Sequence, residues 1–204
     1  MYKGNKGFIL KFGDLAKTLS LEDWKTTSLE DLDSDTEWVA IVTDDAEAYL
    51  NEINAIVTKM KHPKTCFVID LHPCANYKHL QKLWDNYMMV DRESVEVLLS
   101  FIHHHLVNHS MISFTIQDFR VCSVPYPFVK AVSADIVKDA PIDPNAQAMC
   151  YGLCFEQACG LGTSYVNAFA KTTDKIGEDK YVPWSIQNSS DNVIEAIFFY
   201  ERKF

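Results

Sequence analysis

The sequence predicts a three-layer α/β protein, with a central, mostly parallel sheet, helices on both faces, and a C-terminal helical and edge-strand extension. Two apolar runs, Trp38–Thr43 and Cys66–Ile69, do not alternate with polar residues, which is typical of strands buried on both faces. A segment of helical composition separates them, and strand–helix–strand order with short connections favours parallel pairing. We expect one domain over residues 1–204, with a parallel core at 1–128 and the extension at 129–204.

Composition narrows the class of protein. The 204 residues carry a net charge of −9 and are 48% hydrophobic, as in ordinary globular proteins. The 19 Lys and Arg residues are scattered, which disfavours nucleic acid as a main partner. No apolar stretch approaches the roughly 20 residues that span a bilayer, and the apolar run near the N-terminus is too short for a signal peptide. We therefore expect a cytoplasmic protein with no membrane association, whose 6 cysteines stay reduced.

The first 110 residues alternate between strand and helix patterns. The predicted helices carry apolar residues at intervals of three and four, and Pro63 ends one of them. Ser20 resembles a helix N-cap. The predicted strands are Phe8–Phe12, Trp38–Thr43 and Cys66–Leu71, and the predicted helices lie within 15–32, 46–61, 77–87 and 91–109.

After residue 110, the regular alternation of strand and helix patterns no longer continues. Met111–Val124 has an alternating start and is predicted to be a strand that Pro125 ends. Ala146–Ala170 is rich in Ala, Gly and Cys and is predicted to form two helices divided by glycines. Val193–Tyr200 is the final strand, either antiparallel at the sheet edge or paired with the strand before Pro125. Its large side chains on both faces need covering, either by the protein itself or by another subunit, so contact with a protein partner or self-association is a secondary expectation.

Polar residues follow two of the predicted strands at their carboxyl ends. In an open α/β sheet, ligands bind in the crevice outside these ends. If the two strands are neighbours, their polar side chains converge. The candidate catalytic residues are Asp70, His72 and Cys74, and the candidate ligand-binding residues are Asp44, Asp45 and Asn76.

Each of these candidates also has a structural interpretation. Asp70 and His72 could hold a divalent metal ion, or they could bond to the backbone of the turn. Asp44 or Asp45 could cap the helix beginning at Ala46, which is the favoured interpretation. Cys74 could be a nucleophile at a helix N-terminus, but a small residue filling a turn is favoured because no base partner is evident.

Two further groups contain metal-binding residue types. His103, His104 and His105 are consecutive, and His105 and His109 have the i, i+4 spacing of metal sites. Consecutive histidines point in different directions around a helix, so one partly buried histidine among solvated ones is favoured. Cys150, Cys154 and Cys159 lack the close pairs of a structural zinc site and are interpreted as buried core cysteines.

Residues 37–50 (EWVAIVTDDAEAYL) resemble the second strand and following helix of the FtsZ-type cell-division GTPases, the bacterial tubulin homologues. Phe67–Asp70 is similar to their strand before the phosphate loop, and Ser123–Phe128 to a segment after a later strand. That family contacts phosphates through a glycine-rich first turn and a GGGTGTG loop, whereas this sequence has GDL at 13–15 and LHPCAN at 71–76. The resemblance covers at most the first 130 residues. It implies a degenerate relative of the tubulin/FtsZ-type GTPase fold that has lost GTP hydrolysis, and it assigns no GTP-binding residue.

The sequence thus leads to two functional hypotheses. The first is a non-catalytic ligand-binding or protein-interaction module on a nucleotide-fold-like scaffold, because the strand order is intact while the phosphate loops are missing. The alternative is a small metal-assisted hydrolase or phosphoesterase using Asp70 and His72, with a divalent metal as its cofactor. Asp70-Leu71-His72 resembles the DxH motif that opens metallophosphoesterase sites, although the GD and GNH blocks of that family are missing here.

Overall fold

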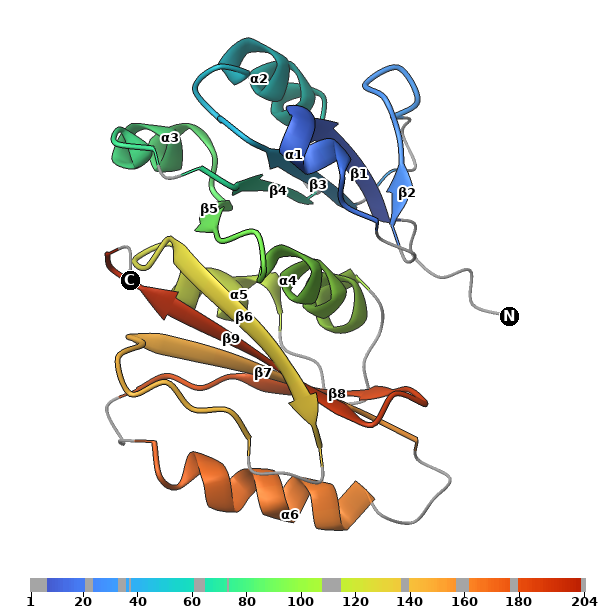
Figure 1. Ribbon diagram of the computed structural model, residues 1–204, viewed down its shortest axis with the longest axis vertical. Coiled ribbons are helices and arrows are strands. Elements are labelled where there is room, and N and C mark those ends of the chain that lie inside the picture. Colours follow the sequence, from blue (N-terminus) through green and yellow to red (C-terminus); the bar gives the residue numbers. More distant parts are fainter. Residues whose placement is uncertain are drawn as a thin grey trace.

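The computed structural model describes residues 7–20, 24–32, 36, 38–60, 65–72, 74–107, 115–136, 140–156, 162–176 and 180–202. Within these residues a nine-stranded sheet runs in the order β2-β1-β3-β4-β5-β6-β9-β7-β8 (Figure 1). The strands are β1 (Gly7–Phe12), β2 (Lys25–Thr26), β3 (Trp38–Thr43), β4 (Thr65–Asp70), β5 (Tyr87–Val90), β6 (Phe128–Asp135), β7 (Ala148–Phe155), β8 (Trp184–Asn188) and β9 (Val193–Tyr200).

The sheet is mostly parallel, which confirms the predicted fold class. β3 lies between β1 and β4 and is parallel to both, so that Thr43 is opposite Phe12 on one side and Asp70 on the other. β5 continues the parallel series from β4 to β6. β9 alone among the described strands runs against its neighbours, and it is antiparallel to both β6 and β7.

Helices cover both faces of the sheet, as the unbroken apolar strands predict. Alternate residues of β3 face opposite cores: Val39 and Ile41 belong to the core that also includes residues of α2, α3 and α6, whereas Ala40 and Val42 belong to the core that includes residues of α1, α4, α5 and η1. The helices are α1 (Asp14–Lys17), α2 (Leu50–Lys59), α3 (Tyr77–Leu83), α4 (Val95–Ile102), the π-helical turn η1 (His103–Val107), α5 (Ile116–Ser123) and α6 (Gly162–Thr173).

Several predicted elements of the first half are shorter than expected. Residues 15–32 were expected to form a helix, but the structure has α1 there, followed by the short strand β2. The predicted helix over 77–87 ends at Leu83, because Tyr87–Val90 forms β5 between β4 and β6. Tyr87 and Met89 face one core and Met88 and Val90 the other, so this short apolar run is a strand buried on both faces.

The prediction of a strand over Met111–Val124 is wrong for residues 116–123, which form α5. A capping box fixes the start of this helix: Asp118 N–H donates to Thr115 Oγ1 at 3.3 Å, and Thr115 N–H donates to Asp118 Oδ2 at 2.7 Å. Phe119 and Cys122, three residues apart, are buried against the sheet. Local capping together with helical spacing therefore outweighs the strand propensity of this segment.

The prediction of two helices over Ala146–Ala170 is wrong in its first half. Residues 148–155 form β7, in which large side chains (Met149, Tyr151, Leu153, Phe155) face one core and small ones the other. This strand alternates in side-chain size rather than in polarity, because both of its faces are buried. The small residues suggested a helix, whereas the period of two belongs to a strand.

The final strand, β9, has the predicted residues and the antiparallel direction, but it lies inside the sheet. Both backbone edges of β9 are paired, with β6 and with β7, and its large side chains are buried in the two cores of the protein. The edge strands of the described sheet are β2 and β8. None of the described helices is both long and apolar enough to cross a bilayer.

The interior position of β9 gives a testable expectation. Ile197 is fully buried between the sheet and its helices, so Ile197→Ala should lower the free energy of unfolding by about 2–5 kcal/mol through lost burial and a cavity. Ile142 is 36% exposed, and the matched variant Ile142→Ala should cost less than about 1 kcal/mol. Urea denaturation followed by circular dichroism measures both, and equal costs would contradict the interior placement.

Candidate functional site

The carboxyl ends of β1, β3 and β4 meet at one edge of the sheet. β3 and β4 are parallel neighbours, with Thr43 opposite Asp70, so the predicted pairing of these two strands is confirmed. Asp44 and Asp45 follow β3 directly, and Asp70 ends β4. The chemistry available at this edge then depends on what each carboxylate contacts.

The carboxylate of Asp44 points across β1 to the start of α1. The backbone N–H groups of Leu15 and Ala16 donate to its two oxygens, each at 2.7 Å. Gly13, just before α1, has a φ of +92°, and a Cβ atom there would overlap the Asp44 carboxylate. Glycine is required at this turn both for its backbone conformation and for the space that the carboxylate occupies.

Asp45 caps the turn that leads into α2. Its Oδ1 accepts hydrogen bonds from the N–H groups of Glu47 and Ala48, both at 3.0 Å. The side chain is exposed. Asp45 therefore stabilises the local backbone.

Asp70 is buried, with 1% of its surface exposed. The Tyr87 hydroxyl donates to Oδ2 at 2.8 Å, and the His72 N–H donates to Oδ1 at 3.1 Å. Burial raises the pKa of Asp70 to about 6, although these hydrogen bonds partly oppose the rise. Tyr87 was not among the residues selected from the sequence, because only its place on β5 brings it to β4.

The other candidates lie around the Asp70 turn. The His72 side chain is exposed, whereas its backbone serves Asp70. Cys74 Sγ accepts from the Asn76 N–H at 3.3 Å, and burial raises the pKa of its thiol, which disfavours the thiolate. The Asn76 side-chain amide donates to Glu47 at 2.9 Å. Asp45, Asp70, Cys74 and Asn76 thus gather beside the turn at Glu47, whereas Asp44 is directed to α1.

A second polar cluster lies where η1 packs against the sheet. It consists of His104, His105, Cys154 and Glu195, and we call it the histidine–cysteine cluster. Their potential ligand atoms all lie within 4.8 Å of one another. In the sequence, His105 with His109 and Cys150 with Cys154 and Cys159 were two separate groups, and a metal site was disfavoured for both. His109 and Cys159 lie outside the described residues.

The electrostatics of this cluster follow from its burial. Burial alone would raise the pKa of Glu195, but the imidazoles of His104 and His105 and the Ser100 hydroxyl lower it to about 2. Burial lowers the pKa of His105 and raises that of the Cys154 thiol. Glu195 was not selected from the sequence, although a lone carboxylate within the apolar run VIEAIFFY is a usable signal of a buried polar partner.

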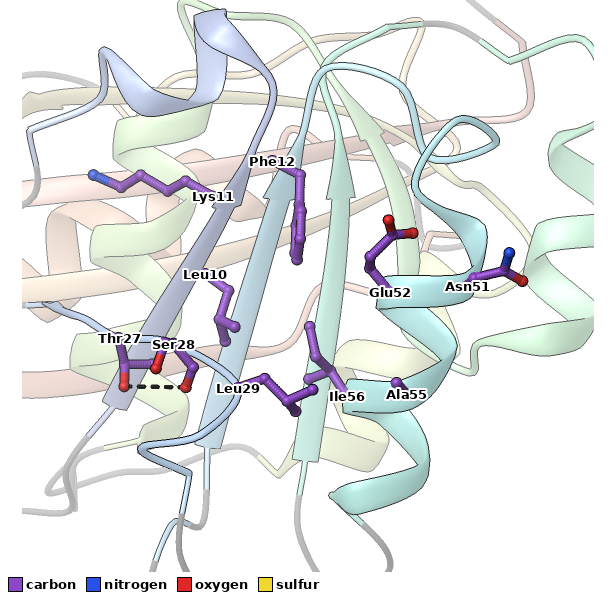
Figure 2. A pocket seen from close by; sticks show the side chains of 10 residues that line it. All are labelled: Leu10, Lys11, Phe12, Thr27, Ser28, Leu29, Asn51, Glu52, Ala55 and Ile56. Atoms are coloured by element: carbon purple, nitrogen blue, oxygen red, sulfur yellow. Dashed lines mark hydrogen bonds between the residues drawn. The ribbon is translucent and has the colours of Figure 1, made fainter.

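A largely apolar cavity of about 600 Å³ lies between β1, the segment at 27–29 and α2. Figure 2 shows Phe12 and Leu10 from β1 on one side, Ile56 and Ala55 from α2 on the other, and Leu29 at one end. Glu52 and Lys11 also line the cavity. Its volume is in the range of small-molecule sites. The residues predicted as catalytic do not line it.

Comparison with solved structures places this arrangement among known folds. An FtsZ variant from M. jannaschii is similar over 81% of this chain and 66% of that chain, at 8% identity and a TM-score of 0.50. An FtsZ dimer from the same organism is similar over 80% of this chain and 62% of that chain, at 11% identity and a TM-score of 0.45. CetZ from Methanosaeta thermophila is similar over 83% of this chain and 53% of that chain, at 11% identity and a TM-score of 0.42. No protein-family model and no curated protein matches the sequence.

The chain thus spans less than two thirds of the length of these structures. At such low identity the likeness concerns the fold alone, and it agrees with the resemblance of residues 37–50. The protein has the tubulin/FtsZ-type fold.

Proposed function

We propose that the protein is a non-catalytic ligand-binding or protein-interaction module on this nucleotide-fold scaffold. The proposal depends on one observation: the carboxylate of Asp44 accepts hydrogen bonds from the backbone N–H groups of Leu15 and Ala16. Free N–H groups at the start of a helix are the usual donors to a phosphate in α/β nucleotide folds. Here a side chain of the protein accepts these hydrogen bonds, and an incoming phosphate would have to displace a carboxylate.

The charges around the edge support the same proposal. Asp44, Asp45 and Glu47 follow the end of β3 at this edge of the sheet, and the whole chain carries a net charge of −9. A nucleoside polyphosphate approaching this edge meets like charges, and the turn at 71–76 has no glycine to bring backbone N–H groups close.

The cavity of Figure 2 is where we propose that a ligand or an apolar side chain of a partner binds. It combines apolar walls from Leu10, Phe12 and Ile56 with a few polar groups at its rim, the composition usual for binding sites. No phosphate-binding feature is needed for such a ligand, so this function is compatible with the Asp44 arrangement.

Nucleotide binding is the first test of this proposal. Calorimetric titration of the protein with GTP or ATP, each with Mg²⁺, should show no binding tighter than a Kd of about 1 mM, which corresponds to about 4 kcal/mol. Incubation with these nucleotides and with bis(p-nitrophenyl) phosphate should release no product. Tighter binding, or turnover that Asp70→Ala removes while the fold is kept, would overturn the non-catalytic proposal.

The metal-assisted hydrolase remains the rival because Asp70 has a shifted pKa at the carboxyl end of a strand. Under our proposal Asp70 is structural. Its pKa in the folded protein lies above the ordinary 3.8, so folding favours the protonated form, and this stabilisation is present below pH 4 and lost as the pH rises through 6. Between pH 4 and pH 7, the free energy of unfolding of the wild type should therefore fall by about 2–3 kcal/mol more than that of Asp70→Asn.

Urea denaturation at several pH values measures this effect, with the exposed Asp85→Asn as a control for the loss of one carboxyl group. The stability of Asp70→Asn relative to the wild type should increase from pH 4 to pH 7. Parallel curves would contradict the structural role. A rise in melting temperature with Mn²⁺ that Asp70→Asn alone abolishes would favour the rival.

The cavity can be tested with the neutral apolar dye Nile red. Ala55 is exposed in the wall of the cavity, so Ala55→Trp should fill it and weaken dye binding by about tenfold, or about 1.4 kcal/mol. Ala168→Trp, at an exposed position on α6, is the matched control and should bind the dye like the wild type. Fluorescence titration measures both, and equal affinities would show that the dye binds elsewhere.

A further inference from the structure

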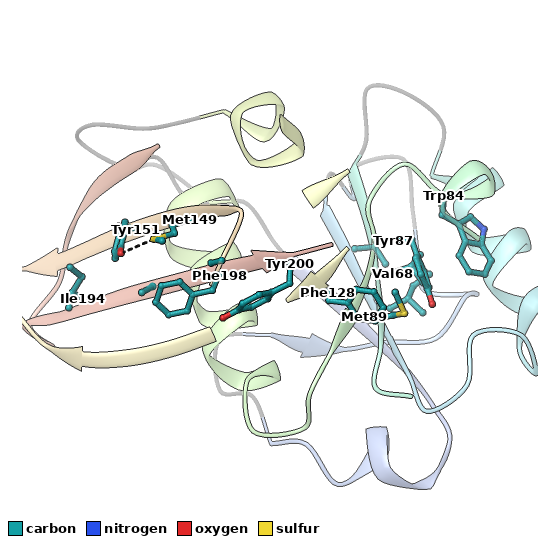
Figure 3. Close-up of a cluster of buried hydrophobic side chains, with 14 of the residues drawn as sticks. Val68, Trp84, Tyr87, Met89, Phe128, Met149, Tyr151, Ile194, Phe198 and Tyr200 are labelled. Carbon is teal, nitrogen blue, oxygen red and sulfur yellow. Dashed lines mark hydrogen bonds between the residues drawn. The ribbon is translucent and has the colours of Figure 1, made fainter. Parts of the chain in front are cut away.

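The histidine–cysteine cluster is assembled from three parts of the chain that are far apart in sequence. His104 and His105 lie on η1, Cys154 on β7 and Glu195 on β9. β9 and β7 are adjacent and antiparallel, with Glu195 opposite Gly152, so Glu195 and Cys154 lie on the same face of the sheet. Figure 3 shows the opposite core, to which the neighbouring Ile194 and Tyr151 belong.

The spacing of the four potential ligand atoms matches a tetrahedral zinc site. Zinc bonds of 2.0–2.3 Å at tetrahedral angles separate nitrogen from oxygen ligands by about 3.4 Å and sulfur from nitrogen by about 3.6 Å. Glu195 Oε2 lies 3.2 Å from His105 Nε2 and 3.6 Å from His104 Nδ1. Cys154 Sγ lies 3.5 Å from His105 Nε2 and 3.9 Å from His104 Nδ1.

The surroundings hold the ligands in place. Ser185 Oγ lies 2.7 Å from His105 Nδ1, a hydrogen bond that leaves Nε2 directed at the cluster. The Ser100 hydroxyl donates to Glu195 Oε1 at 2.6 Å, so Oε2 is the oxygen that faces the two imidazoles. Contacts of this kind to the second atom of a ligand are typical of protein metal sites.

Space for the cluster depends on Gly152. A Cβ atom at this position would overlap the imidazole of His105. In the sheet, Gly152 lies between Ser185 of β8 and Glu195 of β9. Because Gly152 has no side chain, the imidazole of His105 can lie between these two polar residues. The small face of β7 thus makes room for a histidine.

The second carboxylate oxygen of Glu195, Oε2, is the atom of the cluster that most needs a cation. Among the described residues, no group donates to Glu195 Oε2 in hydrogen-bond geometry, although the residue is only 3% exposed. An unpaired buried carboxylate oxygen is costly, and a cation at the centre of the four atoms would remove that cost.

We propose that His104, His105, Cys154 and Glu195 bind one Zn²⁺ ion. Nitrogen, sulfur and carboxylate donors together suit zinc better than Mg²⁺ or Ca²⁺, which prefer oxygen. Four protein ligands complete a tetrahedral shell without an open position, as in structural rather than catalytic zinc sites. The ion ties η1 to β7 and β9, and its function is to stabilise the C-terminal half of the sheet.

The test uses the full chain, stripped with a chelator and titrated with Co²⁺ as a spectroscopic substitute for zinc. One equivalent should produce the absorption of four-coordinate cobalt together with a thiolate-to-cobalt charge-transfer band, and Zn²⁺ should displace it. Zn²⁺ should also raise the melting temperature of the stripped protein, because it binds the folded state. A folded protein that gives no charge-transfer band and gains no thermal stability from Zn²⁺ would overturn the proposal.

Variants identify the ligands. Cys154→Ala should lose the charge-transfer band, whereas Cys150→Ala, which removes a buried cysteine from the same face of the same strand, should keep it. Ser185→Ala should weaken zinc binding about 10–100-fold without removing the charge-transfer band, because the Ser185 hydroxyl orients His105 and is not itself a zinc ligand.

His104→Gln provides the second ligand test if Cys154→Ala does not fold, because the His104 side chain is 19% exposed at the rim of the cluster. It should keep the charge-transfer band and weaken zinc binding at least tenfold. Unchanged zinc affinity in His104→Gln, or a charge-transfer band that persists in Cys154→Ala, would place the metal elsewhere and refute the site.

Discussion

A sheet that is covered on both faces leaves its buried polar groups without water, and this constraint governs the rest of the structure. Burying an unpaired carboxylate is costly, so each one must find donors within the protein. Asp70 at the end of β4 accepts from the Tyr87 hydroxyl and a backbone N–H, and Glu195 within β9 accepts from the Ser100 hydroxyl at one of its two oxygens. The apolar strands that make the fold stable therefore also determine which polar side chains come together.

The N-terminal and C-terminal halves of the protein satisfy the buried carboxylates in different ways. At the carboxyl ends of β3 and β4, the acidic side chains bond to nearby backbone and to Tyr87, and they become part of the turns. In the C-terminal half, the histidine–cysteine cluster joins three distant segments, and one carboxylate oxygen accepts no hydrogen bond from the part of the chain that the structure describes. The first arrangement favours a structural role, whereas the second has the composition and spacing of a site for a cation.

Two glycines show how closely these polar groups depend on space. Gly13 combines a positive φ with the position where a side chain would strike Asp44, and Gly152 stands where a side chain would strike His105. Each glycine lies next to a polar group that the fold has to accommodate. At the start of α1, the carboxylate of Asp44 accepts hydrogen bonds from the N–H groups of Leu15 and Ala16.

The sequence by itself determined the strands β1, β3 and β4, their parallel order, the FtsZ-type resemblance and the edge at which Asp44, Asp45 and Asp70 stand. These features depend on local apolar runs and short connections, which are visible along the chain. Only the tertiary structure decided that β9 lies inside the sheet, that Tyr87 pairs with Asp70, and that Cys154 and Glu195 lie beneath η1. The side-chain contacts join residues that are 17 to 95 positions apart in the chain, so no local pattern indicates them. The strand β7 was not recognised because its residues alternate in size and not in polarity.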